Sequence, residues 1–177
     1  MIMKHLLFST LIFALSVLSL GAQQYQGQFA VTLMDAGAVP SAVVQAQDSN
    51  FPGITVRQWK KQEYQGKRSS STQYLAVFTQ NGQNIRVRYT DTGRGISTYT
   101  TYGPEALPTP ITETISTTYA DYSLTGAAEI ASLQQAWSGF RIRLRKGGQK
   151  LVVWLNADGE LINPQGVPQE VSAEEAE

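Results

Sequence analysis

A short pattern of residues occurs twice in this chain, 68 positions apart, and this duplication limits the possible folds more than any other feature. The stretch VPSAVVQAQDSNFPG begins at Val39, and the similar stretch LPTPITETISTTYAD begins at Leu107. A chain that repeats a pattern at a fixed period builds its fold from similar structural units. The sequence therefore predicts two related units that share one core.

Each copy begins with the signals of a short helix and continues with those of several strands. Pro40 and Pro108 stand at the start, where proline is well tolerated, and aliphatic residues follow at helical spacing. The period then changes to two, interrupted by Asn81-Gly82 in one copy and Gly147-Gly148 in the other, which are typical of tight hairpin turns. We expect each copy to consist of one helix followed by four strands.

A further turn near the end of each copy invites a calcium interpretation, because oxygen ligands precede a glycine. The residues concerned are Asp91 in the first copy, and Asn156 and Asp158 in the second. The alternating acids and the terminal glutamate of a calcium loop are missing, so a plain turn is favoured. We expect no metal and no cofactor.

The first residues have the composition of a secretory signal peptide. A basic start, Lys4 and His5, is followed by an apolar run and by a small-residue cleavage site at Gly21-Ala22. The run is short for a membrane span, so we expect cleavage before Gln23 and an exported protein, periplasmic or secreted, that does not span the membrane. The chain contains no cysteine, and its single histidine lies in this leader.

The absence of histidine and cysteine from the predicted mature chain excludes the common nucleophilic triads and the usual zinc sites. The remaining carboxylate candidates are Glu113, Glu129 and Asp158, and they fall on a helix, a strand and a turn that have no reason to converge. We therefore expect no enzymatic activity.

The charges are distributed unevenly between the body and the end of the sequence. Four acids and no base follow Gln165, whereas the rest of the mature chain has thirteen Lys and Arg against ten acids. Residues 166–177 also contain few apolar side chains, which is typical of a disordered, solubilising tail.

The order of these signals resembles the PepSY-like family related to the beta-lactamase inhibitory protein. The residues that carry the resemblance are Val39-Pro40, Phe51-Pro52-Gly53, Asn81-Gly82, Gly93, Leu107-Pro108, Gly147-Gly148 and Asp158-Gly159-Glu160. The second copy departs from the pattern after its helix, where Ala120-Asp121 replaces Pro52-Gly53. The resemblance implies an α+β fold: two tandem units, each a helix plus an antiparallel meander, forming one curved sheet with helices on one face.

The corresponding division of the chain has five parts. They are a signal peptide at 1–22, an N-terminal lead segment at 23–38, repeats at 39–103 and 104–165, and the acidic tail at 166–177.

Members of the broader group bind proteins, and some inhibit hydrolytic enzymes. The resemblance thus implies a binding module whose partner is another exported protein, with hydrolases among the candidates.

Strand alternation predicts which side chains the other face of the sheet displays. If Phe140, Ile142 and Leu144 contact the helices, the arginines between them point away. The predicted protein-binding residues on this free face are Trp59, Leu75, Val77, Arg86, Arg88, Arg141, Arg143, Val152 and Trp154. A bulge in the strand from Ile54 to Tyr64 would reverse the direction of Trp59. Aromatic and aliphatic residues surrounded by arginine are typical of interface hot spots.

Several alternatives remain for this face. Its apolar residues are also consistent with burial under residues 25–38, or with contact to a second copy of the chain, although the composition favours a binding face. The small positive charge of an exported protein disfavours nucleic acid. The main functional alternative is an envelope carrier or sensor that binds a small ligand in the concavity of the sheet.

Overall fold

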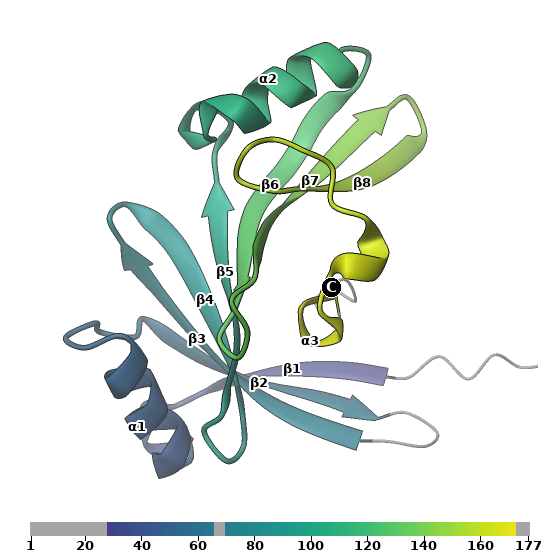
Figure 1. Cartoon of the computed structure of the whole chain (residues 1–177). Helices are drawn as coiled ribbons and strands as arrows, with labels where there is room; N and C mark the ends of the chain where they lie inside the picture. Colours follow the sequence, from purple (N-terminus) through teal and green to yellow (C-terminus); the bar gives the residue numbers. More distant parts are fainter. Residues whose placement is uncertain (1–27, 66–69, 173–177) are drawn as a thin grey trace, which may run out of the picture.

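The computed structural model describes residues 28–65 and 70–172, so the predicted signal peptide lies outside the described residues. Within these ranges the chain forms one eight-stranded antiparallel sheet in which every strand pairs with its sequence neighbours (Figure 1). The strands are β1 (Gln28–Met34), β2 (Gln58–Gln65), β3 (Ser70–Gln80), β4 (Gln83–Thr90), β5 (Gly95–Tyr102), β6 (Ser123–Ser132), β7 (Ser138–Lys146) and β8 (Gln149–Leu155). The predicted α+β class is confirmed.

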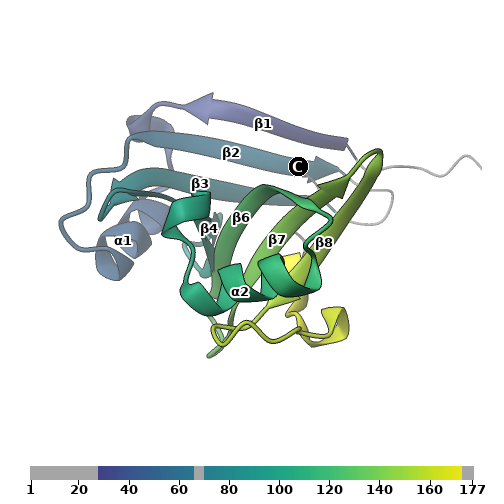
Figure 2. The same cartoon turned by 90° about the horizontal axis from the view of Figure 1, so that it is seen from above.

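The helices divide between the two faces of this curved sheet. Two ten-residue helices, α1 (Ser41–Asn50) and α2 (Thr109–Thr118), lie on the convex face. A short helix, α3 (Gln169–Ser172), lies inside the curve, between the sheet edges formed by β1 and β8 (Figure 1). The view from above shows α1 beside the strands of the first half and α2 beside those of the second (Figure 2). None of the helices in the described ranges is long and apolar enough to cross a membrane.

The predicted proline-started helices form where the sequence places them. Pro40 and Pro108 precede α1 and α2 directly, and each accepts a hydrogen bond from the amide three residues later. Those amides belong to Val43 and Ile111, whose side chains are fully buried under the helices. A three-residue 3-10 helix stands before each start, η1 (Ala36–Ala38) and η2 (Pro104–Ala106).

Two apolar clusters fill the space between the convex face and the helices, one under α1 and one under α2. The second contains Phe140, Ile142 and Leu144, as the alternation of β7 predicts. The first contains Trp59, which is 6% exposed. The prediction that Trp59 lies on the free face is therefore wrong. Trp59 pairs with Ala76 of β3, another member of this cluster, so its side chain points to the face that α1 covers.

Two glycine turns, each at the end of a strand, lie against the helices. Gly93 and Gly159 both have a positive φ, 83° and 80°. A Cβ at Gly93 would lie 2.4 Å from the carbonyl oxygen of Ala42 in α1, and one at Gly159 would lie 2.5 Å from that of Pro110 in α2. The two turns predicted from Asp-Gly-type sequences thus serve as docking points for the first turns of the helices.

The end of the chain differs from its prediction. After β8 the sheet gains only an isolated bridge between Leu155 and Leu161, not a fourth strand of the second unit. A third 3-10 helix, η3 (Pro164–Gly166), and α3 follow. The predicted disordered tail is therefore wrong for residues 166–172, and residues 173–177 lie outside the described part of the chain.

The physical reason is a third helix start that the sequence analysis missed. Val167-Pro168 is followed by Val171, as Leu107-Pro108 is followed by Ile111. The amide of Val171 donates to the carbonyl of Pro168 at 2.9 Å, and Val171 is fully buried. Two aliphatic side chains at this spacing supply enough apolar area to dock a short acidic segment.

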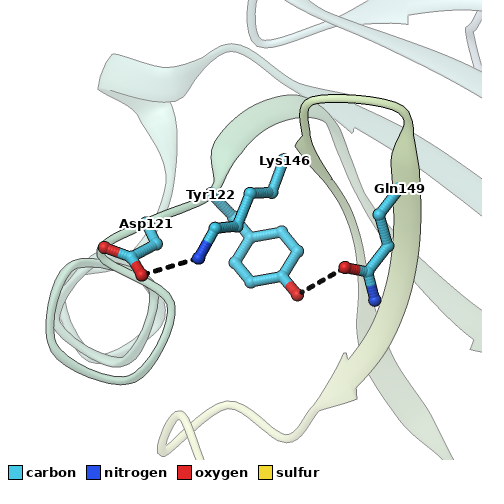
Figure 3. A network of polar contacts seen from close by, with 4 residues as sticks. All are labelled: Asp121, Tyr122, Lys146 and Gln149. Atoms are coloured by element: carbon cyan, nitrogen blue, oxygen red, sulfur yellow. Dashed lines mark hydrogen bonds and ion pairs between the residues drawn. The ribbon is translucent and has the colours of Figure 1, made fainter.

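A small polar network fastens the end of α2 to the β7–β8 hairpin (Figure 3). Lys146 pairs with Asp121 at 2.8 Å, and the hydroxyl of Tyr122 donates to Gln149 at 3.3 Å. The Lys146 hydrogen bond lowers the pKa of the Asp121 carboxyl. Both charged groups are well exposed, so the pair contributes little to stability.

Candidate protein-binding face

The sheet face that turns away from α1 and α2, called the concave face below, carries most of the predicted binding residues. Strand register places Val77, Arg86, Tyr99 and Ile130 side by side across β3, β4, β5 and β6. Because side chains alternate between faces along a strand, these four point to the same side. Ile130 belongs to the cluster that contacts the C-terminal helix, which identifies that side as the concave one.

Three arginines surround one tyrosine on this face, and we call this group the arginine–tyrosine cluster. The guanidinium carbon of Arg86 lies 4.6 Å from the centroid of the Tyr99 ring, and that of Arg141 lies 5.6 Å from it. Arg143 donates from Nη2 to the Tyr99 hydroxyl at 3.3 Å. Guanidinium groups over an aromatic face are attracted by its quadrupole, so the ring holds the cations together.

The most unusual member of the cluster is Arg141, which is only 4% exposed. Its Nε and Nη1 atoms are buried and have no hydrogen-bond partner among the described residues. A buried donor without a partner costs free energy, more so when the group is charged. Such a guanidinium is suited to a carboxylate that arrives from outside the sheet.

The C-terminal segment, defined here as residues 161–172, covers the neighbouring part of the concave face. Val167 and Val171 are buried in a cluster with Ile130 and Trp154. Tyr99, Trp137 and Ile162 pack against this cluster, and the rings of Trp137 and Trp154 meet edge to face at 5.8 Å. Tyr99 therefore belongs both to the arginine–tyrosine cluster and to the seat of the C-terminal segment.

Polar contacts also hold the segment in place. The carboxylate of Glu170 accepts hydrogen bonds from Gln135 Nε2 at 2.8 Å and from Ser132 Oγ at 3.4 Å. Arg88 donates from Nη2 to the backbone carbonyl of Glu170, and from Nε to Ser97 Oγ at 3.1 Å. These bonds use side chains of β4, β6 and the loop after β6 to fix the first turn of α3.

The structure thus separates the nine predicted binding residues into three groups. Trp59 lies on the convex face, in the core under α1. Four others lie on the concave face but are buried: Leu75, Arg88, Arg141 and Trp154. The remaining four are reachable there to different degrees, Val77 and Arg86 being partly buried and Arg143 and Val152 exposed.

The alternative in which residues 25–38 cover this face is wrong for the residues described. Gln28–Met34 form β1, which extends the sheet at its edge by pairing with β2. The cover comes from the other end of the chain. Tyr99, Ile130, Val167 and Val171 were missed, and the signal available in the sequence was the third occurrence of an aliphatic residue followed by proline.

A polar groove borders the C-terminal segment. It has a volume of about 740 Å³, and Gln73, Arg94, Gln134 and Glu170 are among its lining residues. The volume lies within the range of small-molecule sites, but such sites are usually lined by apolar and aromatic groups. Ile96 is the one apolar side chain among the described residues that line this groove.

The three carboxylates considered for catalysis do not meet. Glu113 is exposed on α2, and Asp158 is exposed in the turn after β8. Glu129 accepts a hydrogen bond from the Tyr102 hydroxyl at 3.0 Å. Burial raises the pKa of Tyr102, and the bond to Glu129 acts in the same direction, so this pair has a structural explanation.

Comparison with known proteins identifies related folds. No protein-family model matches the sequence, and no curated protein matches it. A BLIP-like protein from Bacteroides fragilis is similar, with a TM-score of 0.56 and 15% identity over 69% of this chain and 82% of that one. A DUF2874 family protein from Bacteroides uniformis gives a TM-score of 0.55 and 16% identity over 70% and 86%.

A protein from Bacteroides eggerthii whose name places it in the periplasm has a TM-score of 0.54 and 17% identity, over 71% of this chain and 86% of that one. At these identities the similarity concerns the fold. The chain therefore has a BLIP-like α+β fold, as the resemblance in its sequence implies.

Proposed function

We propose that this chain is an exported, non-enzymatic binding module that recognises another exported protein through its concave face. The observation that carries the proposal is the buried guanidinium of Arg141, two of whose donors lack a partner in the described part of the chain. An arginine beside aromatic and aliphatic side chains is the composition of an interface hot spot. A carboxylate of the partner would complete the hydrogen bonding of Arg141 once the atoms that cover these two donors have moved aside.

Exposed residues next to Arg141 would form the rest of the contact. Arg143 and Val152 pair across β7 and β8, and both are exposed on the same face. Arg143 would steer an acidic partner, and Val152 would lose its exposed apolar area on binding. Trp59 is not part of this surface, since its side chain belongs to the core under α1.

Export, inhibition and the repeat organisation belong to the same proposal. The BLIP-like fold supports a protein-binding role, and the leader at 1–22 supports export to the periplasm or beyond. We propose PepSY-like repeats at 39–103 and 104–165, supported by the order of one helix and then paired strands in each, four after α1 and three after α2. Binding over a hydrolase active site would act by occlusion.

An affinity capture from the envelope and culture supernatant of the source organism tests this function. The full chain is compared with the double variant Arg143→Glu, Val152→Asp, in which both exposed residues of the proposed contact are changed. A control variant, Lys146→Glu, alters an exposed cation that pairs with Asp121 near α2. We expect one protein to be retained by the wild type and the control, and lost with the double variant.

The result that contradicts the proposal is equally specific. If the double variant retains the same protein as the wild type, the part of the concave face around Arg143 and Val152 is not the contact surface. The retained protein is then assayed for hydrolytic activity with and without a molar excess of the chain, which separates inhibition from simple binding.

A small-ligand carrier remains the second candidate, because one observation favours it. The polar groove beside the C-terminal segment has about 740 Å³, enough for a small polar molecule. Native mass spectrometry of the chain purified from its own organism would detect such a ligand. A stoichiometric mass that Arg94→Ala removes would favour the carrier over the binding module.

A further inference from the structure

The C-terminal segment repeats the structure of the two other helix starts but occupies the opposite face of the sheet. In all three, a buried aliphatic residue precedes proline and a second one follows at the third position after it. The exposures of these pairs agree closely, at 7% and 0% for Val39 and Val43 and at 8% and 0% for Val167 and Val171. The first two starts pack on their own units, whereas the third packs on the arginine-bearing face.

The seat of this segment has the features of a peptide-binding site. It presents apolar side chains, Ile130 and Trp154, to two aliphatic residues of the segment. It also supplies donors to the Glu170 carboxylate and to its backbone carbonyl. Recognition of a short helical segment through spaced apolar anchors is a common mode of peptide binding.

The resident segment leaves part of this site unused. Glu170 is bound by Ser132 and Gln135, at the β6 side of the seat. Arg141, whose guanidinium carbon lies 5.6 Å from the centroid of the Tyr99 ring, keeps two buried donors without a partner in the described ranges. A segment with the same aliphatic pair and one more carboxylate in reach of Arg141 would make every contact of the resident and one further ion pair.

We infer that the C-terminal segment is a displaceable resident ligand, and that the partner protein replaces it with a segment of the same chemistry. That segment is an acidic helix start in which two aliphatic residues flank a proline and an acid, as in Val167-Pro168-Gln169-Glu170-Val171. The identity of the partner segment rests on the function proposed above. The existence of a peptide seat does not, so the two can fail separately.

Opening the seat in the full chain tests the inference. Val171→Asp places a charge in a fully buried apolar position and releases the segment. The probe is a fluorescent synthetic peptide of residues 163–177, and its binding is followed by anisotropy. Since a ligand binds only the fraction of molecules with a vacant seat, we expect the variant to bind at least about tenfold more tightly than the wild type.

Two controls make the measurement specific. Leu161→Asp introduces the same charge in the same segment, at a side chain that is 61% exposed, and should bind the peptide as weakly as the wild type. A peptide with aspartate at both valine positions should bind neither chain. A Val171→Asp chain that unfolds cooperatively but does not bind the peptide would overturn the inference.

Hydrogen exchange on the wild type decides the matter if Val171→Asp fails to fold. The amides of Gly166, Val167 and Val171 are bonded within the segment, so they exchange when it leaves its seat. We expect them to exchange at least about a hundredfold faster than the amide of Ile142 in β7. Equal rates would mean that the segment leaves only on global unfolding, and would overturn the inference.

Competition identifies the occupant. The peptide should release the captured partner from the Val171→Asp chain. Peptide binding without any captured partner would support the seat and sink the proposed function, whereas a captured partner that the peptide does not displace would sink the inference alone. A wild-type dimer in light scattering that Val171→Asp abolishes would show that the occupant is a second copy of the chain, and would contradict the assignment to another protein.

Discussion

Arg88 in β4 donates a hydrogen bond to the backbone carbonyl of Glu170, 82 residues later in the chain. The same guanidinium donates to Ser97 and, at 3.5 Å, to Gln73. One buried side chain thus connects three strands of the sheet to the segment that crosses their concave face. Predicted as an exposed interface residue, Arg88 is instead the polar support of an internal contact.

Replacing this support should loosen the C-terminal segment. Arg88→Met keeps much of the side-chain volume and removes three hydrogen bonds, while it also removes the cost of burying a charge. We expect a loss of about 1–3 kcal/mol in the free energy of unfolding, with faster amide exchange at Val171. Arg145→Met, at an exposed position of β7, should change stability by less than about 0.5 kcal/mol. Equal losses in the two variants would contradict the role given to Arg88.

Trp59 should matter for stability and not for binding. Its ring is 6% exposed and packs in the cluster under α1, so truncation leaves a large cavity. We expect Trp59→Ala to lower the free energy of unfolding by about 3–5 kcal/mol in chemical denaturation. Val152→Ala, at a side chain that is 48% exposed, serves as the comparison and should be nearly neutral. A stable Trp59→Ala chain that loses its partner would restore the original prediction for this residue.

The two docking glycines should be equally intolerant of a side chain. Alanine at Gly93 or Gly159 would combine a left-handed backbone with a Cβ inside contact distance of a helix carbonyl. We expect each substitution to cost about 2–4 kcal/mol in thermal or chemical unfolding. Gly82→Ala offers a matched control in a turn, because Gly82 also has a positive φ, 77°, and nothing lies within 4 Å of its Cβ position. Similar costs at all three glycines would argue against close helix docking as the cause.

Stability should fall at high pH because of Tyr89. Burial raises the pKa of Tyr89 to about 12, and its hydroxyl donates to Gln47 at 2.9 Å. Above a pH of about 10 the unfolded tyrosine loses its proton while the folded one keeps it, so the folded state binds more protons. The contribution is complete below about pH 10 and is lost as the pH rises through 12.

Thermal unfolding between pH 9 and 12 measures this dependence. Tyr89→Phe should be less stable at neutral pH by about 1–2 kcal/mol, since the buried Gln47 oxygen loses its donor. Its melting temperature should fall less steeply above pH 10 than that of the wild type. Burial also raises the pKa of Tyr102, so some slope should remain. An unchanged slope in Tyr89→Phe would refute the assignment.

The local features of the fold were predictable because their causes are local. Proline at a helix start, the Asn81-Gly82 turn with φ of 51° and 77°, and alternation along β7 depend on neighbouring residues only. Periodicity also indicated correctly that Phe140, Ile142 and Leu144 contact a helix. Periodicity placed Trp59 on the wrong face. The phase of β2 is fixed by its pairing with β3, in which Trp59 lies opposite Ala76, and not by the residues that precede the strand.

The candidate site was predictable in its strands and not in its cover. Alternation placed Arg86, Arg141 and Arg143 on one face, where they surround Tyr99. That Trp154 packs against Val171 depends on a segment that returns from the end of the chain. Composition suggested that residues 166–177 were a solvated tail, since their four acids outnumber their two valines.

The helix starts, the hairpin turns and the alternating faces of most strands follow from the amino-acid sequence, because each of these depends on interactions among residues close together in the chain. Which face of the sheet is covered, and by what, depends on contacts between distant parts of the chain. A helix start with two aliphatic residues can pack on either face, and its choice depends on apolar side chains that distant strands bring together. In this protein Ile130 and Trp154 form that seat, and Val167 and Val171 occupy it.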